Sequence, residues 1–156
     1  MAKRISVAKR GNSIEPGMTG HDGLRGPHDP VTRYLAERGV STAVLGTGLL
    51  GLVANWDAIA LRAERYDLTL DDWLNDLDLR DIIAGAMSVA PEHDRHAVQS
   101  ILGVADDRFR RATVEAPRPL VADADCVVQW WYLRYPARPG ARMRNDLLAA
   151  GLPTRA

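Results

Sequence analysis

Residues 66–81 read YDLTLDDWLNDLDLRD, and this stretch decides the fold class. Thr69 has the side chain of a helix N-cap, and the aspartates that follow it fall in a first turn, where the helix dipole favours anions. Trp73, Leu74 and Leu77 recur at three- and four-residue steps, so they supply one apolar side. The stretch therefore predicts a capped, aspartate-rich helix.

This helix determines how a glycine-rich hexapeptide upstream is interpreted. Residues 46–51 read GTGLLG, which has the GxGxxG spacing of a dinucleotide-binding turn. Such a turn needs a strand before it, a helix after it, and a second strand with an acidic residue about 20 positions later. A helix at 66–81 leaves no second strand, so we assign no cofactor. We interpret GTGLLG as the start of a long helix over residues 42–66; an extended, sheet-paired segment at 42–45 would restore the cofactor hypothesis.

Capping signals and apolar periodicity predict helices over most of the remaining chain. A short helix begins at Asp29 and Pro30 and stops at Gly39. The helix at 66–81 continues to Pro91, the next helix opens at that proline and runs to about 114, and a short closing helix ends at Gly151.

The secondary structure of one segment, residues 126–135, is less clearly indicated. Residues 126–135 are rich in β-branched and aromatic residues, which favour a strand. Because no second strong strand is recognisable, we rank a helix or an extended packing segment above a sheet.

These signals predict an all-α fold, a single compact bundle of five to six helices. The helical domain covers residues 30–156, and residues 1–29, basic and rich in glycine and proline, form a flexible arm. The expected core consists of the periodic apolar residues Leu49, Val53, Trp56, Ile59, Trp73, Leu77, Ile82, Ile83, Val98, Ile101, Leu102 and Phe109.

The totals of the chain limit the classes of function. Its 156 residues suit one domain, and equal numbers of basic and acidic residues, 20 each, give no general affinity for nucleic acid. A single cysteine, Cys126, excludes an internal disulfide framework and is expected to be buried and inert. We recognise neither a secretory signal nor an apolar run of the roughly 20 residues that cross a membrane, so we expect a cytoplasmic protein. The alanine- and arginine-rich composition suggests a bacterial source.

Negative charge is concentrated between Asp57 and Asp81, where eight acidic residues stand against three arginines, a net charge of −5. A solvated helix face would explain this pattern, and so would a surface that docks a basic partner. The leading hypothesis is a non-enzymatic interaction protein that binds a basic protein partner, for example an antitoxin or immunity protein that neutralises a nuclease. The partner-binding residues would be Asp71, Asp72, Asp76, Asp78, Asp81, Trp131 and Arg134.

A first alternative is a metal-binding protein or an enzyme. His93 and His96 stand three residues apart at a helix start, and Asp72 and Asp76 share one face of the preceding helix. The four side chains would have to converge to hold a metal or to act as acid and base. The sequence shows no nucleophile elbow, phosphate-binding loop or zinc spacing, so we assign no catalytic or metal residue and leave enzymatic activity open.

A second alternative is binding of single-stranded nucleic acid. Tryptophans followed by arginines can stack bases and neutralise phosphates. Consecutive tryptophans cannot face the same side, however, so one is expected to anchor the core while its neighbour covers a rim. The residues concerned are Trp130, Trp131, Arg134, Arg138, Arg142 and Arg144. The oligomeric state is not indicated.

Overall fold

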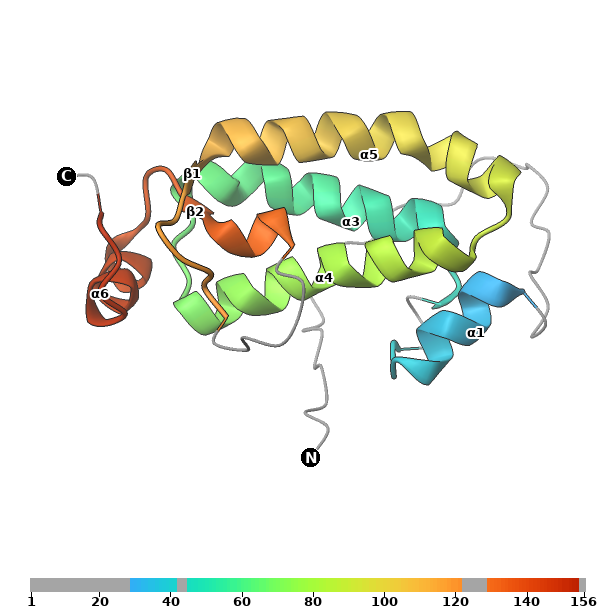
Figure 1. Cartoon of the computed structure of the whole chain (residues 1–156), viewed down its shortest axis with the longest axis horizontal. Helices are drawn as coiled ribbons and strands as arrows, with labels where there is room; N and C mark the ends of the chain where they lie inside the picture. Colours follow the sequence, from blue (N-terminus) through green and yellow to red (C-terminus); the bar gives the residue numbers. More distant parts are fainter. Residues whose placement is uncertain (1–28, 42–44, 122–128, 155–156) are drawn as a thin grey trace, which may run out of the picture.

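Three long helices build the centre of the structure, a computed structural model that describes residues 29–41, 45–121 and 129–154. They are α3 (Gly48–Arg62), α4 (Leu70–Val89) and α5 (Glu92–Ala112). In Figure 1, α3 and α5 run in the same direction, and α4 runs antiparallel to both. The prediction of a mainly helical protein is confirmed for the described residues.

Shorter elements cover the two ends of the long helices. The helix α1 (Pro30–Glu37) packs against α4 at one end, and α6 (Ala141–Ala149) lies at the other (Figure 1). Two 3₁₀ helices, η1 (Ala63–Arg65) and η2 (Trp130–Leu133), complete the helical part of the described residues. No helix of the described segments is both long and apolar enough to traverse a lipid bilayer.

Two predicted helix starts are confirmed by their caps. Thr69 accepts a hydrogen bond from the backbone N–H of Asp72, and the Asp72 carboxylate accepts one from the backbone N–H of Thr69. This reciprocal pair is a capping box, and it fixes the start of α4. Asp29 caps α1, with Pro30 in the first turn.

The start of α3 corrects the helix predicted over residues 42–66. The helix begins only at Gly48, which has a φ of +58°. A side chain at Gly51 would clash with Thr47, so two glycines of GTGLLG set the entry into α3. Residues 42–44 lie outside the described residues. Leu45 donates its backbone N–H to the carbonyl of Ser41, as in one helical turn.

A small antiparallel sheet corrects the expectation for part of residues 126–135. The strand β2 (Arg134–Pro136) pairs with β1 (Thr113–Glu115), and Val114 lies opposite Tyr135. The helix expected to reach about residue 114 therefore ends at Ala112. Three-residue strands are too short to show a two-residue alternation, so they could not be recognised from the sequence pattern. Cys126 and residues 122–128 lie outside the described part.

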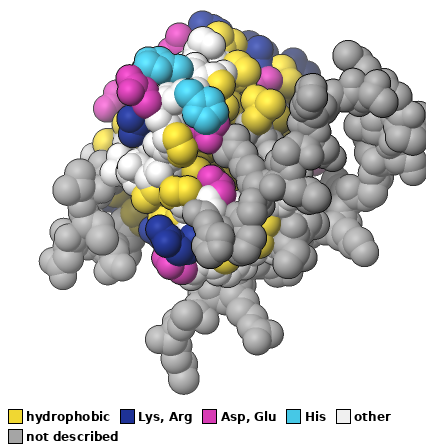
Figure 2. Space-filling view, turned by 90° about the vertical axis from the view of Figure 1, so that its right-hand side faces the viewer, with side chains coloured by type: hydrophobic (Ala, Val, Ile, Leu, Met, Phe, Trp, Pro, Cys, Tyr) yellow, Lys and Arg dark blue, Asp and Glu magenta, His cyan; other side chains and the backbone are white. Residues whose placement is uncertain are grey.

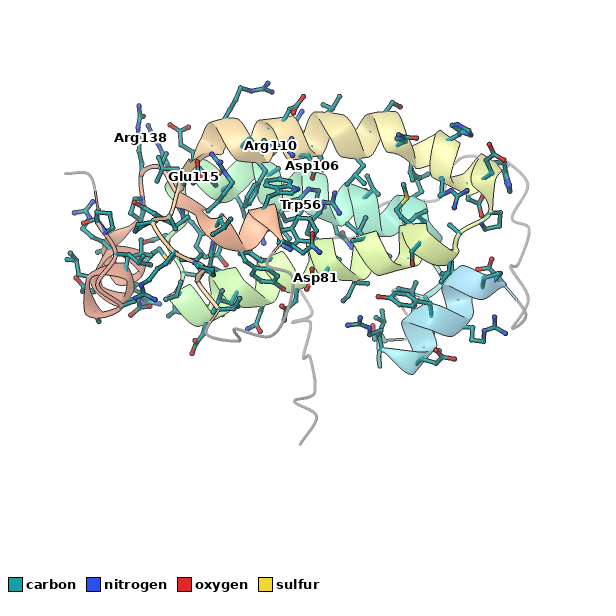
Figure 3. The ribbon with its side chains drawn as sticks, viewed as in Figure 1. Trp56, Asp81, Asp106, Arg110, Glu115 and Arg138 are labelled. Atoms are coloured by element: carbon teal, nitrogen blue, oxygen red, sulfur yellow. The ribbon has the colours of Figure 1, made fainter. Side chains whose placement is uncertain are left out.

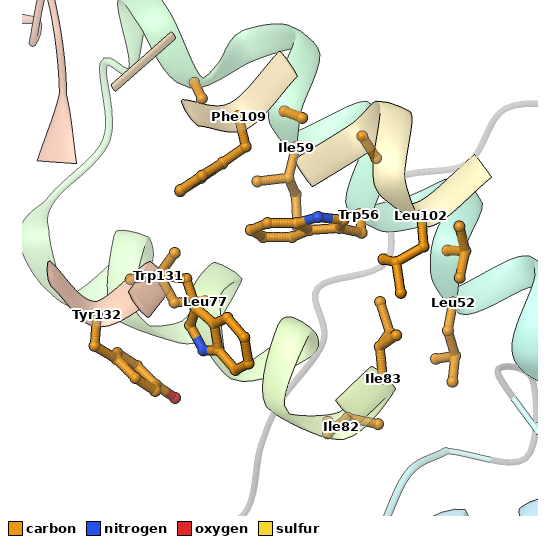
Figure 4. Close-up of a cluster of buried hydrophobic side chains, with 14 of the residues drawn as sticks. Leu52, Trp56, Ile59, Leu77, Ile82, Ile83, Leu102, Phe109, Trp131 and Tyr132 are labelled. Carbon is orange, nitrogen blue, oxygen red and sulfur yellow. The ribbon is translucent and has the colours of Figure 1, made fainter. Parts of the chain in front are cut away.

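The predicted core is confirmed with one exception. Eleven of its twelve residues are buried, whereas Ile101 is 43% exposed. Figure 4 shows Trp56 beside Phe109, and their ring centroids are 4.7 Å apart. Trp131 is buried and Trp130 is half-buried, as expected for consecutive tryptophans at the edge of a core.

Candidate functional site: the aspartates of α4

The five aspartates of α4 lie in two rows. Asp72 and Asp76 lie one helical turn apart on one face of α4; Asp76 contacts Arg62, at the end of α3, and Tyr66. Asp71, Asp78 and Asp81 are separated by seven and three residues, so they follow another face of the helix. We call these three residues the outer row.

Asp72 and Asp76 are both engaged in hydrogen bonds within the protein. Asp72 serves the capping box, and hydrogen bonds from Thr69 lower the pKa of its carboxyl. The Asp76 carboxylate accepts hydrogen bonds from Arg62 and from the hydroxyl of Tyr66, both at 2.9 Å. Burial and the Asp76 charge raise the pKa of Tyr66, which therefore remains a neutral donor.

Two members of the outer row, Asp78 and Asp81, share one hydrogen-bond donor. The Tyr132 hydroxyl lies 2.7 Å from Asp78 Oδ1 and 2.9 Å from Asp81 Oδ2. A tyrosine hydroxyl carries one proton, so it donates to only one carboxylate at a time. Among the residues that the structure describes, neither carboxylate has an ion pair with a basic side chain, and neither does the exposed Asp71. The negative charge of the outer row is therefore uncompensated there.

Arg80, the basic residue nearest to the outer row in sequence, forms its ion pair with another carboxylate, that of Asp106. Arg80 donates from Nε and Nη2 to the two oxygens of Asp106, both at 2.9 Å. The indole of Trp56 donates to Asp106 Oδ1 at 2.8 Å, and Figure 3 shows Trp56 and Asp106 between the long helices. The guanidinium of Arg80 lies 4.6 Å from the ring centroid of Trp131. This buried arrangement holds α3, α4, α5 and η2 together without neutralising the outer row.

Burial raises the pKa of the Asp78 carboxyl; the hydrogen bond from Tyr132 opposes this shift and the charge of Asp81 adds to it. Between the ordinary pKa of 3.8 and the raised value, the folded state binds more protons at Asp78 than the unfolded chain does. The contribution of this group to the free energy of unfolding therefore decreases as the pH rises through the folded pKa.

As the pH rises above the ordinary carboxyl pKa of 3.8, we expect Asp78→Asn to gain stability relative to the wild type, measured by urea unfolding at several pH values. Asp72→Asn is the control of opposite sign: a lowered carboxyl pKa stabilises the fold above its ordinary value and loses this effect on acidification, so this variant should gain stability relative to the wild type as the pH falls below 3.8. If the two variants shifted in the same direction, the assignment of the Asp78 environment would be contradicted.

Trp131 and Arg134, which the sequence assigns to partner binding, contact the chain itself. Trp131 is only 3% exposed. Arg134 donates to the Thr113 hydroxyl and to the carbonyls of Arg110 and Thr113, so it closes the end of α5, and burial lowers its pKa. Tyr132, which lies between them in sequence, is the residue that reaches the outer row.

The structure does not bring together the four residues of the metal-binding alternative. Asp76 precedes the end of α4 by thirteen residues, about 20 Å of helix. His93 and His96 lie beyond that end, and Figure 2 shows the histidine side chains gathered on that end of the molecule. No group of three or more histidine, cysteine, aspartate or glutamate residues in the described segments is arranged to hold a metal ion. The proposed convergence is therefore wrong.

The residues of the nucleic-acid alternative are also engaged within the protein. The guanidinium of Arg110 lies 3.9 Å from the ring centroid of Trp130, so it covers a face on which a base would stack. Arg138 pairs with Glu64 at 3.4 Å, and Arg144 donates to the Pro139 carbonyl at 3.3 Å. Arg142 is exposed and helps to lower the pKa of Asp72.

No protein-family model, curated protein or solved structure matches this chain.

Proposed function

We propose that this chain is a non-enzymatic cytoplasmic protein, a compact helical bundle that binds a basic protein partner through the outer row of α4. One observation carries the proposal: Asp78 and Asp81 share a single hydroxyl donor, and no cation among the described residues compensates their charge. Carboxylates that lack a cation in the free protein are expected to attract one from a partner.

The chemistry of the outer row favours an arginine of the partner. A guanidinium presents five N–H donors in a planar fork, so it can bond to Asp78 and Asp81 together while Tyr132 stays in place. The net charge of −5 between Asp57 and Asp81 would also attract a basic surface over a distance. Nucleases have basic surfaces where they bind phosphates, so a neutralising antitoxin or immunity protein remains the concrete form of this proposal.

The test uses the triple variant Asp71→Asn/Asp78→Asn/Asp81→Asn. The asparagines at positions 78 and 81 each keep an oxygen that can accept the Tyr132 hydroxyl, so the variant removes charge and retains the hydrogen bond. We expect it to bind the partner captured from source cells, and a defined arginine-rich peptide, about 10-fold or more weakly than the wild type. Fluorescence anisotropy at several salt concentrations would measure both the affinity and its salt dependence.

A control with the same change in net charge is Glu92→Gln/Asp107→Asn/Glu115→Gln. These three residues are exposed and belong to α5 and β1, not to α4. We expect their replacement to change the affinity by less than about threefold, as for charges outside an interface. An equal loss in both variants would show that only net charge matters, and that result would contradict the proposed site.

A further inference from the structure

An exposed apolar face runs along α3 and α5, independently of the outer row. Its members follow one another at steps of four, three and four residues on both helices. On α3 they are Leu50, Ala54, Asp57 and Leu61, and on α5 they are Ala97, Ile101, Val104 and Arg108. We call these eight residues the α3/α5 face.

The spacing of the α3/α5 face is typical of helices that pack against other helices. Steps of four, three and four residues average about 3.7, close to the 3.6 residues of one helical turn, so the members form one straight stripe along each helix. The described residues leave seven large hydrophobic side chains exposed, and four of them lie on this face. Their exposed fractions are 57% for Leu50, 67% for Leu61, 43% for Ile101 and 55% for Val104.

The two stripes have a fixed register. Trp56 bonds to Asp106, and Asp57 pairs with Arg108, so residues at the same level of these parallel helices differ by 50 or 51 in number. Leu50 is therefore level with Ile101, and Ala54 is level with Val104. The charged side chains of the face, Asp57 and Arg108, have opposite signs and lie at one level.

We propose that a second copy of this chain covers the α3/α5 face in a symmetric dimer. A two-fold axis parallel to the helices would place α3 of one copy on α5 of the other. Rotation about such an axis leaves the position of every residue along the helix direction unchanged. Leu50 would then meet Ile101 of the second copy, and Asp57 would meet Arg108 of the second copy. The face is thus complementary to itself in charge, and each apolar side chain would meet an apolar side chain.

The size and the charge of the molecule also suit a second copy. The α3 helix has 15 residues, about 22 Å, and two neighbouring helices give a width of about 20 Å. A projected patch of roughly 400 Å² can form the apolar centre of an interface that buries about 800 Å² per partner. The formal net charge is zero, so the two copies would not repel each other over long distances.

The first test measures the oligomeric state of the full chain by sedimentation equilibrium. We expect a wild-type dimer and a dissociation constant roughly 100-fold higher for Val104→Glu, because symmetry places the new charge in the interface twice. Leu148→Glu is the matched control, since Leu148 is 56% exposed on α6. It should leave the dimer unchanged. A monomeric wild type would assign the face to another occupant and overturn the proposal, as would a dimer that tolerates Val104→Glu.

Charge exchange separates contacts between copies from the pair within one chain. Asp57→Arg alone and Arg108→Asp alone should each be monomeric, because like charges would then meet across the interface. An equimolar mixture of the two variants should form a heterodimer, in which opposite charges meet again at both contacts; native mass spectrometry would detect it. Circular dichroism would check that both variants are folded. A mixture that stays monomeric would mean that Asp57 and Arg108 act only within their own chain, and it would contradict the proposed arrangement.

Discussion

Replacing Arg80 with methionine is expected to lower the free energy of unfolding by about 3–5 kcal/mol, since it leaves a buried carboxylate without its cation. Asp106 is only 8% exposed, and of its three hydrogen bonds from side chains, two come from Arg80. The remaining donor, the indole of Trp56, carries no charge and cannot offset the desolvation of the carboxylate. Urea unfolding at neutral pH would measure the loss.

A double-mutant cycle tests this interpretation of the buried pair. In Arg80→Met/Asp106→Asn the charge is removed, and the asparagine oxygen can still accept the bond from Trp56, so we expect much of the stability to return. Arg62→Met is the surface control. Arg62 is 53% exposed in its side chain, and loss of its pair with Asp76 should cost about 0–1 kcal/mol. A similar cost for Arg80→Met and Arg62→Met would contradict the special position of the buried pair.

Trp73→Ala is expected to lower the free energy of unfolding by about 3–5 kcal/mol, through a cavity at the centre of the core. Trp73 is fully buried, its ring stacks on Phe109 at 5.4 Å, and Tyr66 meets it edge-on at 4.8 Å. Its indole N–H donates to the carbonyl of Arg134 at 3.1 Å, so the substitution also leaves an acceptor of β2 without its donor.

The matched control for Trp73 is Trp130→Ala. Trp130 is half-buried and its ring is covered by Arg110, so its removal leaves a site that water can fill. We expect a loss of about 1–2 kcal/mol in the same urea experiment. Equal losses for the two tryptophans would contradict the central position of Trp73 in the core.

Local signals in the sequence predicted most of the helices and most of the core. Thr69 and Asp29 cap helices because a short polar side chain bonds to a backbone N–H two or three residues away. The prediction from periodicity was wrong for Ile101, which was expected in the core but is exposed on α5. Periodicity defines an apolar side, but only the neighbouring helices determine how wide the buried part of that side is.

The candidate site was predicted only in part. The sequence indicated an acidic helix and listed all five aspartates, but it grouped Asp72 and Asp76 as the pair to test. In the structure these two are bound to Thr69, Arg62 and Tyr66, whereas Asp78 and Asp81 share Tyr132. No feature of the sequence pairs Tyr132 with residues about fifty positions away, because that contact depends on where η2 crosses α4.

The sequence by itself determined the helices, their caps and the acidic character of α4, because these properties arise from residues within one or two turns of each other. Only the tertiary structure decided which charges are neutralised. Arg80 meets Asp106 from 26 residues away, and Tyr132 meets Asp81 from 51 residues away. The energy of a charge depends on its distance to other charges and on its exposure to water, and both are set by packing between helices.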